Sequence, residues 1–145
     1  MFRSHPILIV EDSDDDYYAT TRVLAKFGAF PVSRCIQATE VMQHLRQNKS
    51  PDRPSLIFLD LNLSGKGDGR SVLVELKADQ QFRSIPVVIM TTSKNPLDIS
   101  HCFNNGAAGY MVKHVNLDKF VESIEMVLKY WFQVMTLPSK AESAP

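Results

Sequence analysis

Four short apolar segments of this chain each run directly into a chemically reactive side chain. The segments and the groups that follow them are residues 7–10 with Glu11 and Asp12, 56–59 with Asp60, 87–90 with Thr91, and 110–112 with Lys113. Short continuous apolar runs are typical of strands buried on both faces of a parallel sheet. The carboxyl ends of such strands share one edge, where open α/β folds place their sites. The pattern predicts that three carboxylates, a hydroxyl and an ammonium group converge in one crevice.

The segments between these strands carry the periodicity of helices. Apolar residues recur at three- and four-residue spacing, so each segment has one apolar face. Residues 31–36 are predicted to form a further strand, and the last helix is predicted to begin near Asn116. The predicted helical faces are Tyr17, Thr21, Leu24 and Phe27; Ala38, Val41, Met42 and Leu45; Gly69, Val72, Leu73 and Leu76; Ile99, Cys102, Phe103 and Gly106; and Leu117, Phe120, Val121, Ile124, Leu128 and Trp131.

Strands and helices therefore alternate five times along the chain. This order predicts an α/β fold with a doubly wound, flavodoxin-like parallel sheet and helices on both of its faces. Right-handed crossovers leave few arrangements, of which the strand order 2-1-3-4-5 is the common five-stranded one. Its switch point lies between the first and third strands, which carry Glu11, Asp12 and Asp60. The topology therefore predicts that these three acids meet.

The length and composition of the chain limit the classes of function. With 145 residues and 44% hydrophobic content, we expect one globular domain over residues 1–136 and a short disordered tail over residues 137–145. Sixteen basic residues balance sixteen acidic ones, so nothing favours nucleic acid or an anionic membrane as a partner. The chain has no signal-like or membrane-spanning segment, and Cys35 and Cys102 lie far apart, so we expect a cytoplasmic protein with reduced thiols.

The last predicted helix carries an additional apolar sector. Met126, Tyr130 and Val134 fall outside the core stripe on a helical wheel, between that stripe and the charged face. A single sheet face cannot cover both sectors. One interpretation is that these side chains are simply exposed or are covered by the tail. The other is that they form a partner or homodimer surface, because contiguous exposed apolar patches usually mark contacts.

The converging side chains can perform phosphoryl transfer. Clustered carboxylates repel one another, and a hard divalent cation such as Mg²⁺ relieves the repulsion while keeping waters that a phosphate can displace. Asp60 could then attack a phosphoryl group and form an acyl phosphate. Lys113 would neutralise the phosphoryl oxygens, and Thr91 or Thr92 would donate a hydrogen bond to them. Taken singly, Lys113 could be a surface lysine, Thr91 a strand-end cap and Asp60 a turn cap.

Over residues 6–134 the chain resembles the receiver domain of two-component response regulators. The matching motifs are residues 7–12, 59–63 followed by Asp68-Gly69, 91–93, and 109–113. The resemblance implies a phosphoaccepting signalling protein rather than an enzyme, with Asp60 taking a phosphoryl group from a phosphohistidine of a sensor histidine kinase. It further implies a switch pair formed by Thr91 and Tyr110, and Mg²⁺ bound by Glu11, Asp12, Asp60 and the backbone carbonyl of Asn62.

A narrower resemblance is to the small response regulators that partner cyanobacterial and bacterial phytochromes. It rests on residues 87–93, 130–132 and 136–138. It implies a stand-alone regulator with a phytochrome-type kinase as its partner. It also implies a homodimer formed through the fourth helix, the fifth strand and the extended fifth helix, which is where Met126, Tyr130 and Val134 lie.

The chain departs from the receiver pattern at two positions. Lys113 is followed by His114, whereas the family usually has a proline there after a cis bond. A cis bond before another residue costs about 2.5 to 4 kcal/mol, so the bond is either trans or held cis under strain. The loop after Asp60 reads Ser64-Gly65-Lys66-Gly67 where many members have a proline. That loop is expected to be looser and to change how a kinase docks.

Two other functions remain compatible with the sequence. Phosphatases of the haloacid dehalogenase type also place an aspartate nucleophile after a strand, but they usually have a second acid two residues later. That position is Asn62 here, and the chain has no room for a cap domain. The other alternative is an adaptor that keeps the receiver fold but works without phosphorylation. The presence of every motif residue argues against it.

Overall fold

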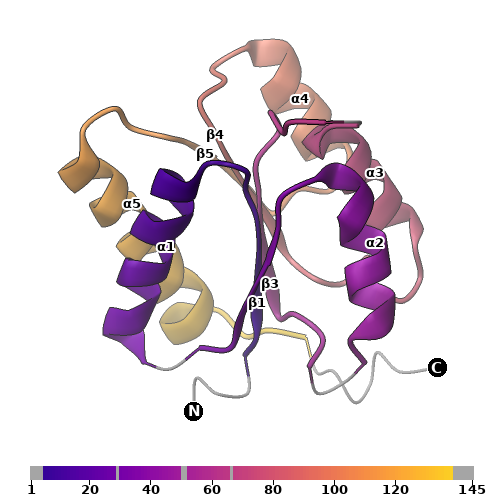
Figure 1. The fold of residues 1–145 in the computed structure, drawn as a ribbon, viewed down its shortest axis with the longest axis horizontal. Coiled ribbons are helices and arrows are strands. Elements are labelled where there is room, and N and C mark those ends of the chain that lie inside the picture. Colours follow the sequence, from indigo (N-terminus) through magenta and orange to yellow (C-terminus); the bar gives the residue numbers. More distant parts are fainter. Residues whose placement is uncertain (1–4, 29, 50–51, 66, 139–145) are drawn as a thin grey trace.

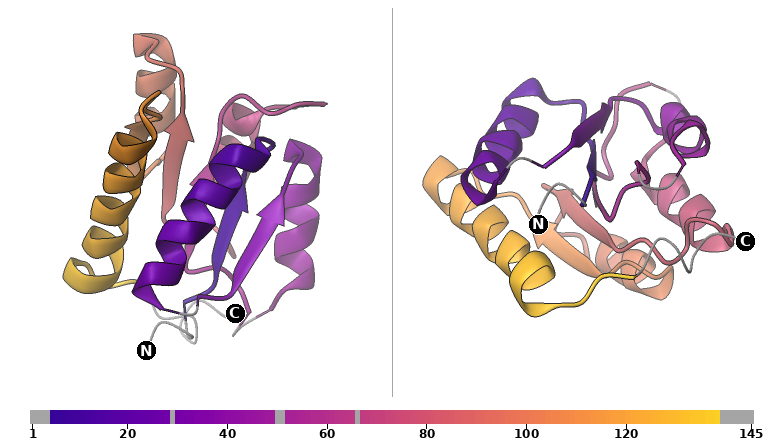
Figure 2. Two further views of the ribbon diagram at one scale, coloured as in Figure 1. Left: turned by 60° about the vertical axis from the view of Figure 1, so that its left-hand side comes forward. Right: turned by 90° about the horizontal axis from the view of Figure 1, so that it is seen from below.

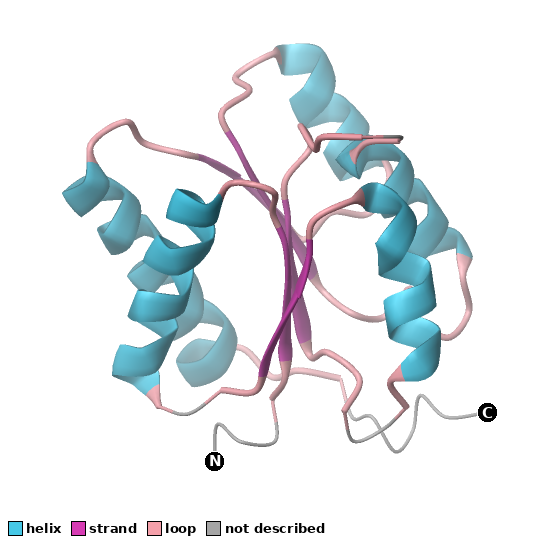
Figure 3. Cartoon of the chain, in the orientation of Figure 1, coloured by secondary structure: helices cyan, strands magenta, loops and turns pink. Residues whose placement is uncertain are grey.

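Five parallel strands form one sheet in the centre of the molecule. The structure, a computed structural model, describes residues 5–28, 30–49, 52–65 and 67–138. The strand order is β2-β1-β3-β4-β5, and every pair is parallel, so the predicted topology is confirmed. The sheet stands between two layers of helices (Figure 3). Its strands are β1 (Ile7–Val10), β2 (Val32–Cys35), β3 (Leu56–Leu59), β4 (Val87–Thr91) and β5 (Gly109–Val112).

The register of the central strands fixes where the acidic residues lie. Val10 at the end of β1 is aligned with Leu59 at the end of β3. The following residues are therefore neighbours, and the Asp60 N–H donates to the Val10 carbonyl at 3.0 Å. Glu11 continues the pairing with β2, because its N–H donates to the Cys35 carbonyl at 3.0 Å. The two carboxylates are thus placed on adjacent strands by backbone hydrogen bonds.

Helices cover both faces of the sheet. Figure 1 shows α1 and α5 on one side of the strands and α2, α3 and α4 on the other, and the view from below in Figure 2 shows the same two layers. Each layer covers its own cluster of buried apolar side chains. The helices are α1 (Asp14–Phe27), α2 (Ala38–Gln47), α3 (Gly69–Ala78), α4 (Pro96–Asn104) and α5 (Leu117–Lys129).

Side-chain caps fix the starts of four helices near the carboxyl edge of the sheet, which is at the top of Figure 1. Ser13 accepts a hydrogen bond from the Asp16 N–H at the start of α1, and Asp68 accepts from two N–H groups of α3. Asn95 and Asn116 cap α4 and α5 in the same way. Each cap contributes about 1 kcal/mol. The caps hold the loops between strands and helices in place, and these loops carry the polar residues described below.

The predicted helical faces differ in how closely they match the structure. The faces of α2 and α3 are buried at every predicted position. In α1 the buried hydroxyl is that of Thr20, whereas the Thr21 hydroxyl donates to the Tyr18 carbonyl at the surface. In α4 Cys102 is the buried residue, and Phe103 is exposed, because α4 lies against the edge strand β5. Leu117 is exposed because it is the first residue of α5, at the open edge of the sheet.

The extension of the last helix is not α-helical. After Lys129 the chain continues as a π-helix, η2 (Tyr130–Val134), closed by a hydrogen bond from the Met135 N–H to the Tyr130 carbonyl. The Phe132 ring lies 4.9 Å from the Phe30 ring, centroid to centroid, which ties this turn to the chain before β2. The predicted extension is therefore present, with a wider turn than a helical wheel assumes. Of the predicted disordered tail, residues 139–145 lie outside the described residues.

Candidate functional site

Three carboxylates meet at the carboxyl edge of the sheet. Glu11 follows β1, Asp12 comes next, and Asp60 follows β3; one carboxylate oxygen from each lies within 4.8 Å of the others. Glu11 and Asp60 are buried, and Asp12 is half-buried. Burial raises the pKa of Glu11 to about 7, and the nearby charge of Asp60 adds to the rise. The structure thus brings together the three acids that the topology placed at the switch point.

Lys113 enters this cluster from the end of β5. Its side chain is only 7% exposed, and its Nζ lies 2.7 Å from Glu11 Oε1 and 3.0 Å from Asp60 Oδ2. A third carboxylate, Asp16 of α1, contacts the same Nζ at 2.8 Å. Burial opposes the charge of Lys113, but its interactions with the acceptor carboxylates of Asp16 and Glu11 outweigh burial and raise the pKa of the ammonium. Lys113 is therefore a buried counter-ion of the acids and not a surface lysine.

Asp12 has a different partner. The backbone N–H and the hydroxyl of Ser64 both donate to Asp12 Oδ2, at 3.0 and 2.5 Å. Partial burial opposes ionisation, but these two hydrogen bonds outweigh it and hold the pKa of Asp12 below its usual value. The sequence patterns predicted no contact between either Ser64 or Asp16 and the acidic cluster. Asp16 belongs to the acidic run after β1, but its spacing gave no indication of a contact with a residue 97 positions away.

Thr91 and Asn62 border the cluster beside Asp60. The buried Thr91 hydroxyl accepts hydrogen bonds from Asn62 Nδ2 at 3.4 Å and from the Ser93 N–H at 3.3 Å. The Asn62 N–H donates to Asp60 Oδ1 at 3.1 Å. The Thr91 hydroxyl is therefore part of the polar network around Asp60 rather than a strand-end cap alone.

Tyr110 contacts the same loop from β5. Its hydroxyl donates to the Ser93 carbonyl at 2.9 Å, and its half-buried ring packs against the core. Burial raises the pKa of this phenol. Thr91 and Tyr110 thus share one partner residue, because they bind the N–H and the carbonyl of Ser93.

A second polar network fixes the loop between β4 and α4. Arg70 of α3 binds both carboxylate oxygens of Asp98, Nε to Oδ1 at 2.7 Å and an Nη to Oδ2 at 2.8 Å. The Ser93 hydroxyl donates to the same carboxylate at 2.6 Å. The guanidinium of Arg70 and the Ser93 hydroxyl lower the pKa of Asp98 to about 2. Sequence patterns gave no signal for this network, since its members come from three separate segments.

Gly69 allows the start of α3 to approach the loop after β3. A Cβ atom at this position would lie 2.1 Å from the Asp60 carbonyl oxygen and 2.7 Å from Leu61 Cα. The Gly69 N–H donates to the Leu61 carbonyl at 3.0 Å. No other residue fits without displacing the backbone that carries Asp60.

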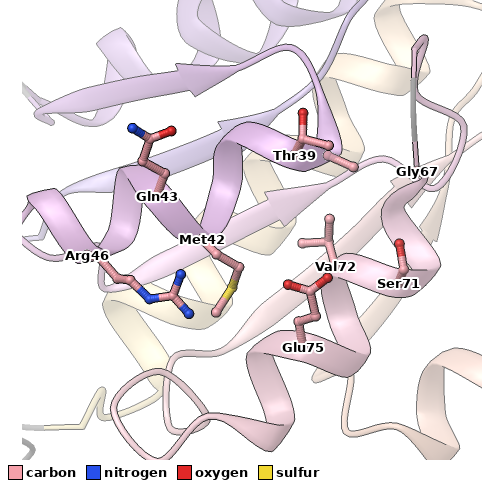
Figure 4. Close-up of a pocket in the computed structure, with 9 residues that line it drawn as sticks. Thr39, Met42, Gln43, Arg46, Gly67, Ser71, Val72 and Glu75 are labelled. Atoms are coloured by element: carbon pink, nitrogen blue, oxygen red, sulfur yellow. The ribbon is translucent and has the colours of Figure 1, made fainter.

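Two of the larger hollows lie away from the acids. One, of about 370 Å³, is between α2 and α3, where Figure 4 shows Arg46 and Glu75 extending from the two helices into the space between them. The other, of about 420 Å³, lies between β5 and α5 and is bordered by Met126 and Tyr130. Met126, Tyr130 and Val134 are 68%, 48% and 66% exposed. The second hollow and these side chains form an apolar surface beside the edge of the sheet.

The acidic cluster has the chemistry of a site for a hard divalent cation. Its donors are carboxylate oxygens, which Mg²⁺ prefers, and its half-buried member Asp12 gives access from solvent. A cation would further relieve the repulsion between the acids, two of which now pair with Lys113. In the part of the chain that the structure describes, no helix is long and apolar enough to cross a bilayer.

Comparisons with known proteins identify the family of this chain. Residues 7–125 match the response regulator receiver domain. Response regulator Rcp1 of Synechocystis sp. is 33% identical over 137 residues, which cover 92% of each chain. The structure is similar to that of the phosphorylated cyanobacterial phytochrome response regulator RcpA (TM-score 0.85, 35% identity) and to the Mn²⁺-bound form of Rcp1 (TM-score 0.84, 34% identity), each over 93% of this chain and 99% of the other. The chain belongs to the response regulator receiver domain family.

Proposed function

We propose that this chain is a stand-alone response regulator that accepts a phosphoryl group from a sensor histidine kinase on Asp60. The observation that carries the proposal is the position of Asp60 between two other acids and the buried ammonium of Lys113. An aspartate in this setting has an acidic cluster for a cation on one side and a fixed positive charge on the other. The match with Rcp1 covers 92% of this chain and 92% of that regulator, so the likeness extends over most of both chains.

Mg²⁺ would be held by Glu11, Asp12, Asp60 and the backbone carbonyl of Asn62. The Mn²⁺-bound form of Rcp1 supports a divalent cation in this chain too. When bound, the cation supplies charge neutralisation for an incoming phosphoryl group. Its binding carboxylates are already assembled, because their oxygens lie within 4.8 Å of one another.

The proposed transfer uses Asp60 as the nucleophile. A carboxylate oxygen of Asp60 forms a bond to phosphorus while the bond between phosphorus and the kinase histidine breaks, and the histidine nitrogen keeps the electron pair. Lys113, whose Nζ is 3.0 Å from Asp60 Oδ2, would stay beside the phosphoryl oxygens and neutralise them. The Thr91 hydroxyl would turn to donate to the phosphoryl group. Such transfer depends on positioning and charge more than on acid-base chemistry.

Thr91 and Tyr110 would transmit the modification. If the Thr91 hydroxyl turns toward the phosphoryl group, it gives up the hydrogen bond from the Ser93 N–H. The Ser93 carbonyl holds the Tyr110 hydroxyl, so a shift of this residue would release or reorient the ring. Tyr110 also borders the hollow between β5 and α5. The proposed switch therefore leads from Asp60 to the apolar surface formed by Met126, Tyr130 and Val134.

The proposed partners are a phytochrome-type histidine kinase and a second copy of this chain. The kinase is suggested by RcpA, which is a cyanobacterial phytochrome response regulator, and by Rcp1. The homodimer would form through α4, β5 and α5, where Met126, Tyr130 and Val134 are exposed beside an apolar hollow. An aspartate-nucleophile phosphatase is a poorer fit, because the position two residues after Asp60 is Asn62 and offers no general acid.

The phosphoacceptor role is tested with acetyl phosphate. We expect labelling of the protein in Mg²⁺, loss of labelling with EDTA, and no labelling of Asp60→Asn. Asp15→Asn, which changes an exposed carboxylate of α1, is the matched control and should be labelled like the unchanged protein. Undiminished labelling of Asp60→Asn would place the nucleophile elsewhere. No labelling of the unchanged protein by acetyl phosphate or by any histidine kinase would favour a phosphorylation-independent adaptor.

The kinase partner is tested by phosphotransfer rates. Autophosphorylated histidine kinases, a phytochrome kinase among them, are mixed with the protein, and loss of label from each kinase is followed over time. A rate from the phytochrome kinase well above the others supports the proposed partner. A higher rate from an unrelated kinase would contradict it.

A further inference from the structure

Ser64 joins the loop that follows Asp60 to the carboxylate of Asp12, which follows the neighbouring strand β1. Its N–H and its hydroxyl donate to the same oxygen of Asp12, at 3.0 and 2.5 Å. These are charge-assisted hydrogen bonds, which are about twice as strong as neutral ones. Asp12 and Ser64 are 52 positions apart, so the contact connects two segments that the sheet only brings near each other.

The same loop is held at its other end by Asp60. The Asn62 N–H donates to Asp60 Oδ1 at 3.1 Å. Residues 60–64 therefore form a short arch. Its Asn62 N–H donates to Asp60, and its Ser64 N–H donates to Asp12. Asn62, whose carbonyl is the fourth proposed magnesium ligand, lies within this arch.

The chain after Ser64 is shaped to keep the arch in place. Gly65 has a φ of +88°, which L side chains rarely adopt, so the chain can turn sharply after Ser64. A Cβ on Gly65 would lie 3.5 Å from the Gln37 side chain, and one on Gly67 would lie 3.3 Å from Ala38 Cβ. The loop thus packs against the start of α2. The glycines had predicted a looser loop, whereas hydrogen bonds to Asp12 and the approach to α2 tie it to the rest of the structure.

We propose that Ser64 is a positioning residue. Before a divalent cation binds, Ser64 holds the Asp12 carboxylate and the arch of residues 60–64 in the conformation that the cation needs. This inference rests on the proposed function, which assigns the cation to these acids. A free aspartate side chain samples several rotamers, and a cation has to fix one of them when it binds. Ser64 fixes one Asp12 rotamer before the cation binds. Groups that orient metal ligands in this way typically change metal affinity about 10- to 100-fold when they are removed.

Three substitutions at Ser64 retain two, one or none of its hydrogen-bond donors. Ser64→Thr keeps both the hydroxyl and the N–H, Ser64→Ala keeps the N–H, and Ser64→Pro keeps neither. The side chain is exposed, so each variant is expected to fold. Ser71→Ala is the matched control, because it removes an exposed serine hydroxyl at the start of α3, where its partner is the Asp68 carbonyl.

The experiment is a calorimetric titration of each metal-free protein with MgCl2. We expect Ser64→Thr and Ser71→Ala to bind like the unchanged protein, Ser64→Ala about tenfold more weakly, and Ser64→Pro more weakly still. Thermal unfolding of each protein in EDTA gives a second readout. A purely structural role would lower stability in EDTA without changing the affinity for Mg²⁺.

The possible failures are distinguishable. Equal affinity of the unchanged protein, Ser64→Ala and Ser64→Pro would overturn the inference and leave the proposed function intact. Tighter binding by Ser64→Ala would also overturn it, because Ser64 would then be holding Asp12 away from the cation. If the unchanged protein binds no Mg²⁺ at all, the proposed magnesium site and the inference that depends on it both fail.

Discussion

Asp16 and Lys113 form a 2.8 Å ion pair between the first turn of α1 and the end of β5. The pair completes the coordination of an ammonium whose other two partners are Glu11 and Asp60. Of the three N–H donors of the ammonium, two are hydrogen-bonded to Asp16 and Asp60, and Glu11 is held as an ion pair. Of the three, Asp16 is the one outside the proposed magnesium ligands. It therefore gives Lys113 a partner that stays available when a cation takes the other acids.

Loss of Asp16 should destabilise the metal-free protein. Asp16→Ala leaves the buried Lys113 with two partners, and we expect the free energy of unfolding in urea to fall by about 1 to 2 kcal/mol. Asp15→Ala makes the same change of charge and residue one position earlier, on an exposed side chain. If both variants lose the same free energy, then the effect comes from the helix terminus and not from Lys113.

Substitution of Gly69 should be costly for a different reason. The Cβ of Gly69→Ala would overlap the Asp60 carbonyl oxygen at 2.1 Å, and backbone cannot move aside as a side chain can. We expect a loss of about 3 kcal/mol or more in the free energy of unfolding. Gly109→Ala in β5, whose Cβ would have its nearest neighbour at 4.0 Å, should change stability by less than about 1 kcal/mol. Similar effects at both positions would contradict the close approach.

The ion pair of Arg70 with Asp98 should be visible in an acid titration. The Asp98 pKa of about 2 lies below the ordinary value of 3.8, so the pair stabilises the fold above pH 3.8, and this contribution is lost as the pH falls through about 2. In Arg70→Gln the pKa of Asp98, followed by NMR of the carboxyl carbon, should rise toward 3.8. Lys77→Gln changes a charge of α3 that binds other groups and should leave this pKa unchanged. An unshifted pKa in Arg70→Gln would show that the guanidinium is not its cause.

The proposed homodimer predicts a sensitive residue at the apolar surface. Tyr130→Ser removes an aromatic ring that borders the hollow between β5 and α5 and should weaken self-association measured by analytical ultracentrifugation. Val115→Ser removes an apolar side chain that is fully exposed, in the loop before α5, and should leave self-association unchanged. A monomer at high concentration, with and without phosphodonor, would exclude the dimer.

The sequence predicted the fold because local patterns and one chain-topology rule were sufficient. The apolar runs identified the strands, and the strand order placed Glu11, Asp12 and Asp60 together although they are far apart in the chain. The helical faces of α2 and α3 were predicted residue by residue, since both helices lie flat on the sheet. The sequence pattern predicted α4 less well. This helix covers an edge strand, and Cys102 is the one residue of its predicted face that is buried.

The second partners of the site residues could not be predicted. Asp16 with Lys113, Ser64 with Asp12, and Arg70 with Asp98 are contacts between side chains from separate loops and helices. Their formation depends on side-chain reach after the backbone is folded, which leaves no periodic signal. The helical wheel also could not anticipate the π-turn after Lys129, because a wheel assumes a constant 100° per residue.

The most direct test of the account is to identify the residue that carries the phosphoryl group. The protein is treated with acetyl phosphate and Mg²⁺, then with borohydride, which reduces an aspartyl phosphate to homoserine, and peptides are sequenced by mass spectrometry. We predict homoserine at position 60 and at no other aspartate, with none in samples that contain EDTA. Homoserine at another position, or none in any sample that carries phosphoryl label, would contradict the assignment of Asp60 as the phosphoacceptor.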